Sequence, residues 1–260
     1  RRGASVVVND LGGTVDGTGS GDSADQVVAE IEALGGKAIA NRDSVADKAG
    51  AERIIQDAVD AFGTVHVLVN NAGILRDRTL KKMSMEDFDV VMQVHMNGSA
   101  YVTKAAWEVM YEQRYGRIVL TSSGSGIYGN FGQSNYGAAK MAMLGFMNVL
   151  VLEGRNRNIR VNCLAPGAAT RMIASIPGRD IDPDNPDPKS HPKLVSPAVL
   201  FMCQEDAPTG VVINASGGNF SRAQVFVNEG VRLGVDASYE ELAAVGETLL
   251  DMAGAAPRER

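Results

Sequence analysis

The feature that most constrains the fold is a regular alternation of short apolar runs with amphipathic stretches. The apolar runs are rich in Val and Ile and predict strands at residues 4–10, 37–43, 65–73, 116–123, 159–167 and 210–218. Helical periodicity predicts helices at residues 23–36, 51–63, 85–113, 135–154 and 196–204, the third bending near Asn97 and Gly98. This alternation predicts an α/β fold with a parallel sheet covered by helices on both faces.

Composition narrows the class of protein. Hydrophobic residues make up 45% and charged residues 22% of the 260 residues, as is ordinary for a globular protein with a sizeable core. The net charge of −6 gives no overall basic footprint for nucleic acid. No apolar run approaches the roughly 20 residues that cross a bilayer. We therefore expect neither a nucleic-acid partner nor a membrane partner.

Cysteine usage and the chain ends predict the compartment. Cys163 and Cys203 are far apart and show neither a disulfide framework nor a metal-ligand spacing, so we expect no metal site and a reducing environment. We find no charged-then-apolar leader, and the final Arg-Glu-Arg is not a peroxisomal address of the Ser-Lys-Leu kind. Together these features predict a cytoplasmic protein.

Tyr136 and Lys140 are four positions apart in a predicted helix, so their side chains share one face. An ammonium group close to a phenol lowers the pKa of the phenol, which suits a Tyr that acts as an acid or base near neutral pH. Many helices carry such a pair without any catalytic role. The pair alone therefore leaves both interpretations open.

Polar or Gly-containing sequences end three predicted strands, at residues 70–73, 121–123 and 165–170. Because open α/β sheets bind ligands at the carboxyl ends of their strands, these ends predict a crevice for a flat ligand. Ser123 lies there, thirteen positions before Tyr136. Asp10 ends the first strand, where a carboxylate is placed to accept hydrogen bonds from a ribose diol. A turn-forming or capping role for Asp10 is an equal alternative.

These residues carry a family resemblance. Asp10, the sequence NNAG at 70–73, the set Ser123, Tyr136 and Lys140, and the sequence PGAAT resemble the short-chain dehydrogenase/reductases in order and spacing. Within that family, the stretches VVVNDLGG, NNAGILRDR and SGIYGNFGQSNYGAAK resemble the (3R)-hydroxyacyl-CoA dehydrogenase part of peroxisomal multifunctional β-oxidation enzymes and its bacterial relatives.

The resemblance implies a Rossmann-type doubly wound sheet and NAD as the cofactor. It implies that Tyr136 removes the hydroxyl proton, that Ser123 holds the substrate oxygen, and that Lys140 lowers the Tyr136 pKa and holds the nicotinamide ribose. Asp10 is implied to bind the adenosine ribose and to repel a 2′-phosphate, which favours NAD over NADP. The other implied cofactor contacts are Asp43 at the adenine, Thr170 at the carboxamide, and Ser44, Val45, Asn71, Ala72, Gly73, Pro166 and Gly167.

One departure from the family pattern concerns residues 94–98. The family usually has an Asn there that props a water molecule for a proton relay, and His95 takes its place in this sequence. The hydroxyacyl-CoA subgroup tends to share this His, so we include His95 among the catalytic candidates. The alternatives are that His95 only shapes the helix bend, and that Asn97 serves the relay.

A second departure concerns the start of the sequence. The first strand of the family and its glycine turn are not found, and in the order 3-2-1-4-5-6 that strand lies between the strands at 4–10 and 65–73. We expect about 25–35 further residues upstream in the natural protein, the size of one strand–turn–helix unit. We expect residues 1–218 to form one dinucleotide-binding domain, with 219–260 as a C-terminal extension packed on it.

The resemblance implies oxidation of a 3-hydroxyacyl-CoA to the 3-keto form and a homo-oligomer, either a dimer or a tetramer. We expect the substrate contacts in the loop at 171–193 and in the tail, where Arg171, Arg179, Lys189 and Lys193 can meet the CoA phosphates. The alternative is that these are solvated charges on a surface loop. Two alternatives stay open. One is an NAD-dependent dehydrogenase of a free alcohol or hydroxysteroid, and the other is a catalytically silent structural subunit.

Overall fold

The computed structural model of the chain describes residues 2–176, 178 and 180–257. It divides into two compact units, Arg1–Arg222 and Ala223–Arg260. The strands of the first unit are β1 (Ser5–Asn9), β2 (Lys37–Asn41), β3 (Val67–Asn70), β4 (Gly116–Thr121), β5 (Ile159–Gly167), β6 (Val212–Ser216) and β7 (Asn219–Ala223), the last reaching the boundary between the units. Its longer helices are α1 (Ser23–Ala33), α2 (Lys48–Phe62), α3 (Met85–Met92), α4 (Gly98–Gln113), α6 (Ser134–Gly154) and α8 (Ser196–Cys203).

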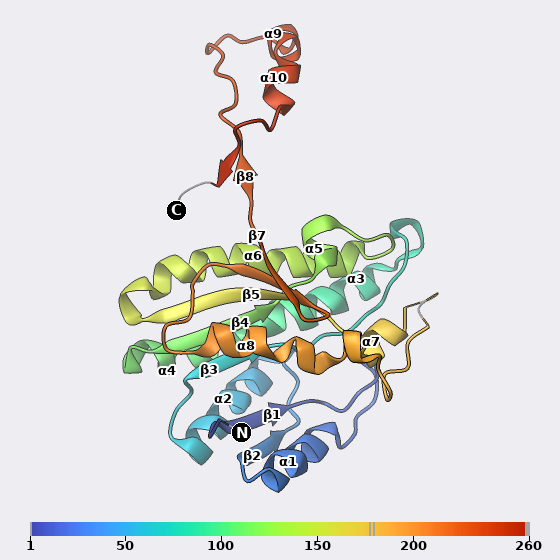
Figure 1. Cartoon of the computed structure of the whole chain (residues 1–260), viewed down its shortest axis with the longest axis vertical. Helices are drawn as coiled ribbons and strands as arrows, with labels where there is room; N and C mark the ends of the chain where they lie inside the picture. The colour runs from blue at the N-terminus through green and yellow to red at the C-terminus, as the bar shows by residue number, and fades with distance from the viewer. Residues whose placement is uncertain (1, 177, 179, 258–260) are drawn as a thin grey trace. The chain divides into compact units, whose positions relative to one another are not determined.

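The strands form a two-stranded and a five-stranded sheet (Figure 1). β1 pairs with β2 in parallel, and β3, β4, β5 and β6 are parallel neighbours in that order, followed by β7. Gly217 and Gly218, both with positive φ, connect β6 to β7, as a tight two-residue hairpin requires. The expected α/β architecture with a parallel sheet is confirmed, while the hairpin partner β7 was not predicted.

β1 and β3 each keep an unpaired edge in the described chain. Val67 and Val69 of β3 are exposed by 41% and 39%, and β1 is only half-buried although its apolar run predicts a buried strand. A strand loses burial when it has a neighbour on one side only. These two edges are the ones between which the expected strand order places a further strand, and the upstream segment that would supply it stays a prediction.

Helices cover both faces of the five-stranded sheet. Successive residues of a strand point to opposite faces. On β5, the Cys163 thiol donates to the Met143 carbonyl of α6, whereas the next residue, Leu164, packs in a core cluster with Met202 of α8. α6 and α8 therefore lie on opposite faces, as the alternating sequence predicts.

A π-helical turn, η2 (Gln93–Asn97), joins α3 to α4. The bend expected near Asn97 and Gly98 lies at this turn. One extra residue in the turn rotates the following side chains, and His95 is left 1% exposed in the interior.

Helix α6 continues into the short turn η3 (Arg155–Arg157), and together they are long and apolar enough to cross a membrane by length and composition alone. α6 packs against β4 and β5, with Ala139, Met143 and Met147 buried. Core helices of globular domains pass the same test, and the buried side of α6 accounts for part of its apolar character.

The second unit contains β8 (Phe226–Val227) paired antiparallel with β9 (Ala256–Pro257), and the helices α9 (Tyr239–Ala244) and α10 (Gly246–Leu250). The spacing of Leu242, Val245, Leu249 and Met252 predicts one face of a single helix, and that prediction is wrong. Val245 separates α9 from Gly246, the first residue of α10, and a Gly in a helix interior costs about 1 kcal/mol relative to Ala. The packing of this extension on the first unit stays a prediction.

The remaining short helical elements lie near the ends of the strands. They are η1 (Leu80–Lys82), α5 (Gly124–Tyr128), α7 (Arg171–Ala174), η4 (Pro188–Ser190) and η5 (Pro192–Leu194). Most of them fall in segments for which the sequence predicts neither a helix nor a strand.

Candidate active site

Asn135 fixes the start of α6. Its side chain is fully buried, and Nδ2 donates to the carbonyls of Arg76 at 3.0 Å and Asp87 at 3.3 Å. Its Oδ1 accepts from the backbone N–H of Tyr136 at 2.7 Å. The first turn of α6 is thereby held against α3 and against the segment that follows β3. Asn135 was not predicted as a site residue, and its position directly before Tyr136 is the one signal that the sequence offers.

The structure brings Ser123, Tyr136 and Lys140 together at the carboxyl end of β4. Ser123 caps α5 by accepting from the N–H of Ser125 at 3.1 Å, and its hydroxyl lies close enough to the Tyr136 phenol to lower the pKa of that phenol. Lys140 is buried, with Nζ 5.5 Å from the centre of the Tyr136 ring. Its Nζ donates to the Thr121 carbonyl at 2.7 Å. Strand β4 thus holds Lys140 at its end and presents Ser123 just beyond it.

Burial decides the protonation of this cluster. Desolvation raises the pKa of Tyr136, the hydrogen bond from Ser123 opposes the rise, and the charge of Asp77 adds to it. Burial also lowers the pKa of Lys140 from 10.5 to about 7. Burial thus outweighs the lowering of the Tyr136 pKa expected from Lys140, because a buried phenol favours its neutral form. The effect of Lys140 on Tyr136 stays a prediction.

His95 contacts the same cluster from the π-helical turn. Its ring meets the Tyr136 ring edge to face, with 5.2 Å between centroids. Nε2 lies 2.8 Å from the carbonyl oxygen of Ile74 and 3.1 Å from its nitrogen. Burial is the main cause that lowers the pKa of His95 to about 3. The charge of Lys140 lowers it further, and the hydrogen bond with Ile74 opposes the lowering. His95 is therefore neutral near pH 7. Asn97, the other relay candidate, hydrogen-bonds Gln93 on the exposed side.

The segment 71–73 leaves β3 beside this cluster. Asn71 and Ala72 are exposed, and Asn71 accepts from the Thr121 hydroxyl at 3.3 Å. A Cβ at Gly73 would lie 2.2 Å from Cε1 of His95. Gly73 therefore permits the close approach of the His95 imidazole. Its predicted contact with a cofactor is a separate role and stays a prediction.

The other predicted cofactor residues lie at three further places. Asp10 is exposed and accepts from the Gly12 N–H at 2.6 Å, a turn-forming contact. Pro166 and Gly167 end β5 opposite Ala215 and Ser216, and Thr170 caps α7 by accepting from Ile173. Asp43, Ser44 and Val45 follow β2, where Gly98 packs on Val45.

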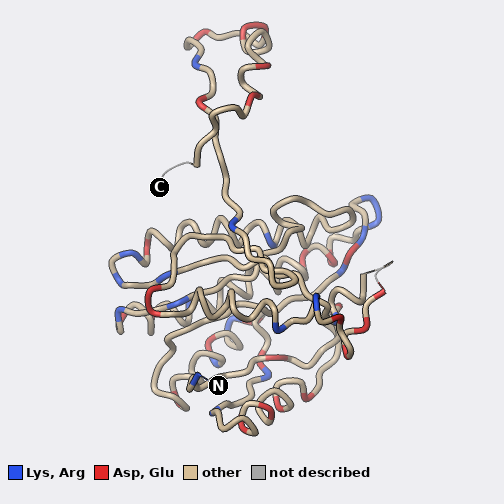
Figure 2. Tube along the Cα trace, viewed as in Figure 1, with Lys and Arg blue, Asp and Glu red and all other residues tan. Residues whose placement is uncertain are grey.

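A cavity of about 380 Å³ lies next to the first turn of α6. Thr79 and Leu80 line one side, and Asn130, Phe131 and Gly137 are among the residues of the other. Phe131 is 90% exposed and Leu80 71% exposed, so the cavity has an apolar rim open to solvent. Basic residues gather beside it in the loop between β3 and α3, which carries Arg78, Lys81 and Lys82 (Figure 2).

The predicted CoA contacts are less well defined. Lys189 and Lys193 lie in the exposed short helices η4 and η5. Arg179 lies outside the described residues. The basic loop beside the cavity was not predicted, because nothing in the sequence shows that it lies next to the cavity.

Comparison with known proteins gives the family. The model of the short-chain dehydrogenase family matches residues 11–178. A short-chain type dehydrogenase/reductase of Mycobacterium tuberculosis is 49% identical over 255 residues, 97% of this chain and 87% of that protein. The crystal structure of a short-chain dehydrogenase from Mycobacterium avium superposes with a TM-score of 0.81, at 37% identity, and covers 98% of this chain and 88% of the other.

A second kind of relative is much longer than this chain. The peroxisomal multifunctional enzyme type 2 of Mus musculus is 52% identical over 205 residues. That match covers 78% of this chain and 27% of the murine enzyme.

The chain belongs to the short-chain dehydrogenase/reductase family, whose members are oxidoreductases. The resemblance found from the sequence motifs is thereby confirmed, including its similarity to the peroxisomal multifunctional enzymes.

Proposed function

We propose that this protein oxidises 3-hydroxyacyl-CoA thioesters to 3-ketoacyl-CoA with NAD. The observation that carries the proposal is the convergence of Ser123, Tyr136 and Lys140 at the carboxyl end of β4. The high identity to part of a peroxisomal multifunctional enzyme supports the thioester substrate. Asp10, exposed at the end of β1, supports NAD over NADP, because its carboxylate would repel a 2′-phosphate.

The residues of the chain divide the chemistry among them. Tyr136 accepts the proton of the substrate hydroxyl, and Ser123 hydrogen-bonds the same oxygen and orients it. Bound NAD supplies the acceptor for the hydride. Tyr136 accepts this proton as the phenolate and becomes the neutral phenol, and the ammonium form of Lys140 favours the phenolate before the transfer, because a positive charge close by stabilises it. Neutral His95 packs against the Tyr136 ring in an edge-to-face contact.

The residues around the cluster suit an acyl-CoA. The apolar rim formed by Leu80 and Phe131 suits an acyl chain, because contacts between apolar groups do not require a particular orientation. Lys81 and Lys82 beside the rim suit the phosphates of CoA. A free alcohol or hydroxysteroid would use the apolar rim without the basic loop.

The test is NADH formation by the purified protein with the separate 3R and 3S forms of a 3-hydroxyacyl-CoA. We expect turnover of the 3R form, lost in Tyr136→Phe. Turnover of neither form, with NAD binding retained, would contradict the thioester substrate and favour a free alcohol or hydroxysteroid. Absence of NAD binding would contradict the enzyme and favour a structural subunit.

We also propose a cytoplasmic homo-oligomer. Met141, Val149 and Leu152 of α6 are exposed by 43%, 52% and 58% and give that helix an apolar outer side that a second copy can cover. Sedimentation of the purified protein tests the assembly, and a monomer at micromolar concentration would contradict it. The similarity to a mycobacterial protein supports the location, which cell fractionation tests.

A further inference from the structure

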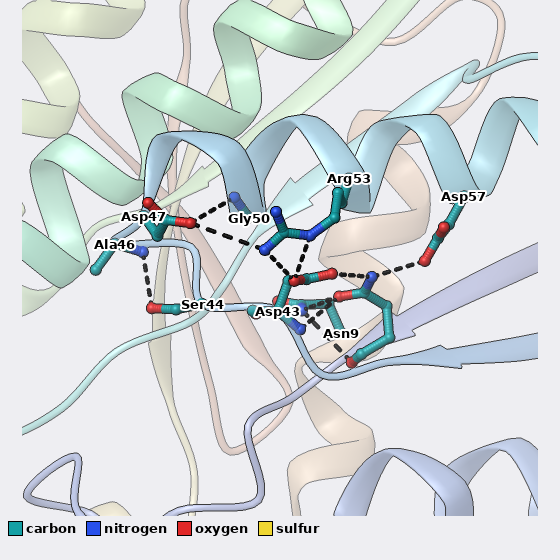
Figure 3. Close-up of polar contacts among 9 residues, drawn as sticks. Asn9, Asp43, Ser44, Ala46, Asp47, Gly50, Arg53 and Asp57 are labelled. Carbon is teal, nitrogen blue, oxygen red and sulfur yellow. Dashed lines mark hydrogen bonds and ion pairs between the residues drawn. The ribbon is translucent and has the colours of Figure 1, made fainter.

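Asp43 is held at four points directly after β2 (Figure 3). Its backbone N–H donates to Oδ1 of Asn41 at 2.9 Å, and its carbonyl accepts from Nδ2 of Asn9 at 2.9 Å. Of its carboxylate oxygens, Oδ2 accepts from Nδ2 of Asn41 at 2.8 Å and Oδ1 from Nε of Arg53 at 2.8 Å. Both the backbone and the side chain of Asp43 are thus oriented before any ligand binds.

Asn41 provides two of these contacts from the interior. It is 4% exposed, accepts from Asn9 at 2.7 Å and donates to Asp57 of α2 at 2.7 Å. With both amide hydrogens donated and its oxygen accepting twice, its hydrogen-bonding capacity is filled. Asn41 is therefore part of the structural core of this corner.

Arg53 provides the fourth contact from the surface of α2. Its side chain is 57% exposed, and Nη2 also lies 2.6 Å from Oδ1 of Asp43. A weaker approach of 3.8 Å joins it to Asp47, which caps α2 through the N–H of Gly50. A Cβ at Gly50 would lie 2.5 Å from the Ser44 carbonyl oxygen. Only a glycine lets α2 start this close to the end of β2, and that approach brings Arg53 to Asp43.

The contacts leave one acceptor position on Asp43. Oδ1 accepts the Nε–H of Arg53 and lies 2.6 Å from its Nη2, whereas Oδ2 accepts only one N–H, from Asn41. A carboxylate oxygen has two lone pairs, so Oδ2 keeps one for a further donor. An exocyclic amine such as that of adenine is a donor of the required kind.

We propose that Arg53 is a positioning residue for the adenosine half of the cofactor, holding the Asp43 carboxylate in one rotamer with Oδ2 available to the adenine amine. This inference rests on the proposed function and on the adenine contact that the family resemblance implies for Asp43. Preorganisation of this kind improves binding because the ligand does not have to order the side chain. An exposed ion pair adds little to folding stability, so its removal affects binding more than it affects the fold.

The charge state of Asp43 gives an independent readout. The hydrogen bond from Arg53 is the main cause that lowers the pKa of Asp43, burial opposes it, and the Asn41 amide adds to the lowering. The other charged groups on this corner, Asp47 and Asp57 of α2, are carboxylates and pair with Arg53 or Asn41. Loss of Arg53 should therefore raise the pKa of Asp43.

The experiment compares Arg53→Gln with Arg42→Gln. Arg42 is the residue before Asp43 but pairs with Asp25 of α1, so the control removes the same charge without touching Asp43. Calorimetry measures the affinity for AMP and for IMP, which lacks the amine. Carboxyl NMR measures the pKa of Asp43 without ligand. We expect Arg53→Gln to lower AMP affinity about three- to tenfold relative to Arg42→Gln, to reduce the preference for AMP over IMP, and to raise the Asp43 pKa.

Two outcomes overturn the inference in different ways. Equal AMP affinity and an unchanged Asp43 pKa in the two variants would show that Arg53 does not position Asp43, while the nucleotide site stands. Failure of the wild-type protein to bind AMP, with the Asp43 pKa still raised in Arg53→Gln, would remove the proposed nucleotide site and the inference with it.

Discussion

The imidazole of His95 stands edge-on to the phenol of Tyr136, with the two ring planes 87° apart. His95 reaches this place because a π-helical turn directs it inward and because Gly73 has no side chain. Its Nδ1 is buried and has no hydrogen-bond partner in the part of the chain that the structure describes. A neutral ring anchored through Nε2 alone is well suited to support Tyr136, and poorly suited to act as a cationic acid.

Gly73→Ala should destabilise the protein through His95. The added methyl group would lie 2.2 Å from Cε1 of the imidazole, so the ring or the backbone has to move. We expect the free energy of unfolding in urea to fall by about 1–3 kcal/mol. In a His95→Ala background the same change should cost less. Strictly additive effects in this double-mutant cycle would contradict the contact.

Lys140 should make stability depend on pH. Its folded pKa of about 7 lies below the ordinary 10.5, so the unfolded chain binds more protons between these values. The free energy of unfolding should therefore rise with pH across that interval, by at most about 1.4 kcal/mol per pH unit from this group, and level off outside it. Urea titrations at several pH values measure the slope. Lys140→Met should flatten it, and an equal slope in wild type and variant would refute the assignment.

Phe131 should set the preference for acyl length if the apolar rim holds the acyl chain. Truncation to Ala removes an exposed ring that a long chain would cover. We expect KM for a long-chain 3-hydroxyacyl-CoA to rise about tenfold, the equivalent of roughly 1.4 kcal/mol of lost apolar burial, with little change for a four-carbon substrate. Tyr128→Ala is the matched control, since Tyr128 is 70% exposed outside the residues that line the cavity. Equal losses for both chain lengths would contradict the role of Phe131.

Lys81 and Lys82 should recognise the CoA part of the substrate. Both side chains are exposed, so each phosphate contact contributes modestly and is screened by salt. The double variant Lys81→Gln, Lys82→Gln should raise KM for the CoA thioester about two- to tenfold at low salt. KM for the same acyl group on a pantetheine thioester, which lacks the nucleotide phosphates, should stay the same. A parallel loss with both substrates would exclude phosphate recognition by this loop.

Arg117 should stabilise the fold without affecting the site. Its fully buried guanidinium donates to the carbonyls of Gly116, Asn158 and Gln204 at 2.7, 2.8 and 3.0 Å. Arg117→Met removes three hydrogen bonds that a buried charged group donates, so we expect a loss of about 3 kcal/mol or more in urea unfolding. Arg114→Met, at an exposed residue with one 3.3 Å bond to Asn156, should cost within about 0.5 kcal/mol. Similar losses in the two variants would contradict this account.

The sequence by itself determined the order and type of most elements of the first unit. β5 was predicted with the bounds that the structure shows, and α6 and α8 each within one residue, because periodicity and turn residues are local properties of the chain. The Tyr136–Lys140 pair was predictable for the same reason: a spacing of four places two side chains on one face of a helix.

The tertiary structure alone decided what surrounds those residues. Burial raised the pKa of Tyr136 where the neighbouring Lys140 was expected to lower it, and only packing sets burial. Contacts between residues far apart in the chain, such as His95 with Gly73 and Arg53 with Asp43, depend on how close two elements approach. Local sequence patterns do not determine that distance. The spacing of residues predicts which side chains share a face, and the packing of the elements decides what each side chain contacts.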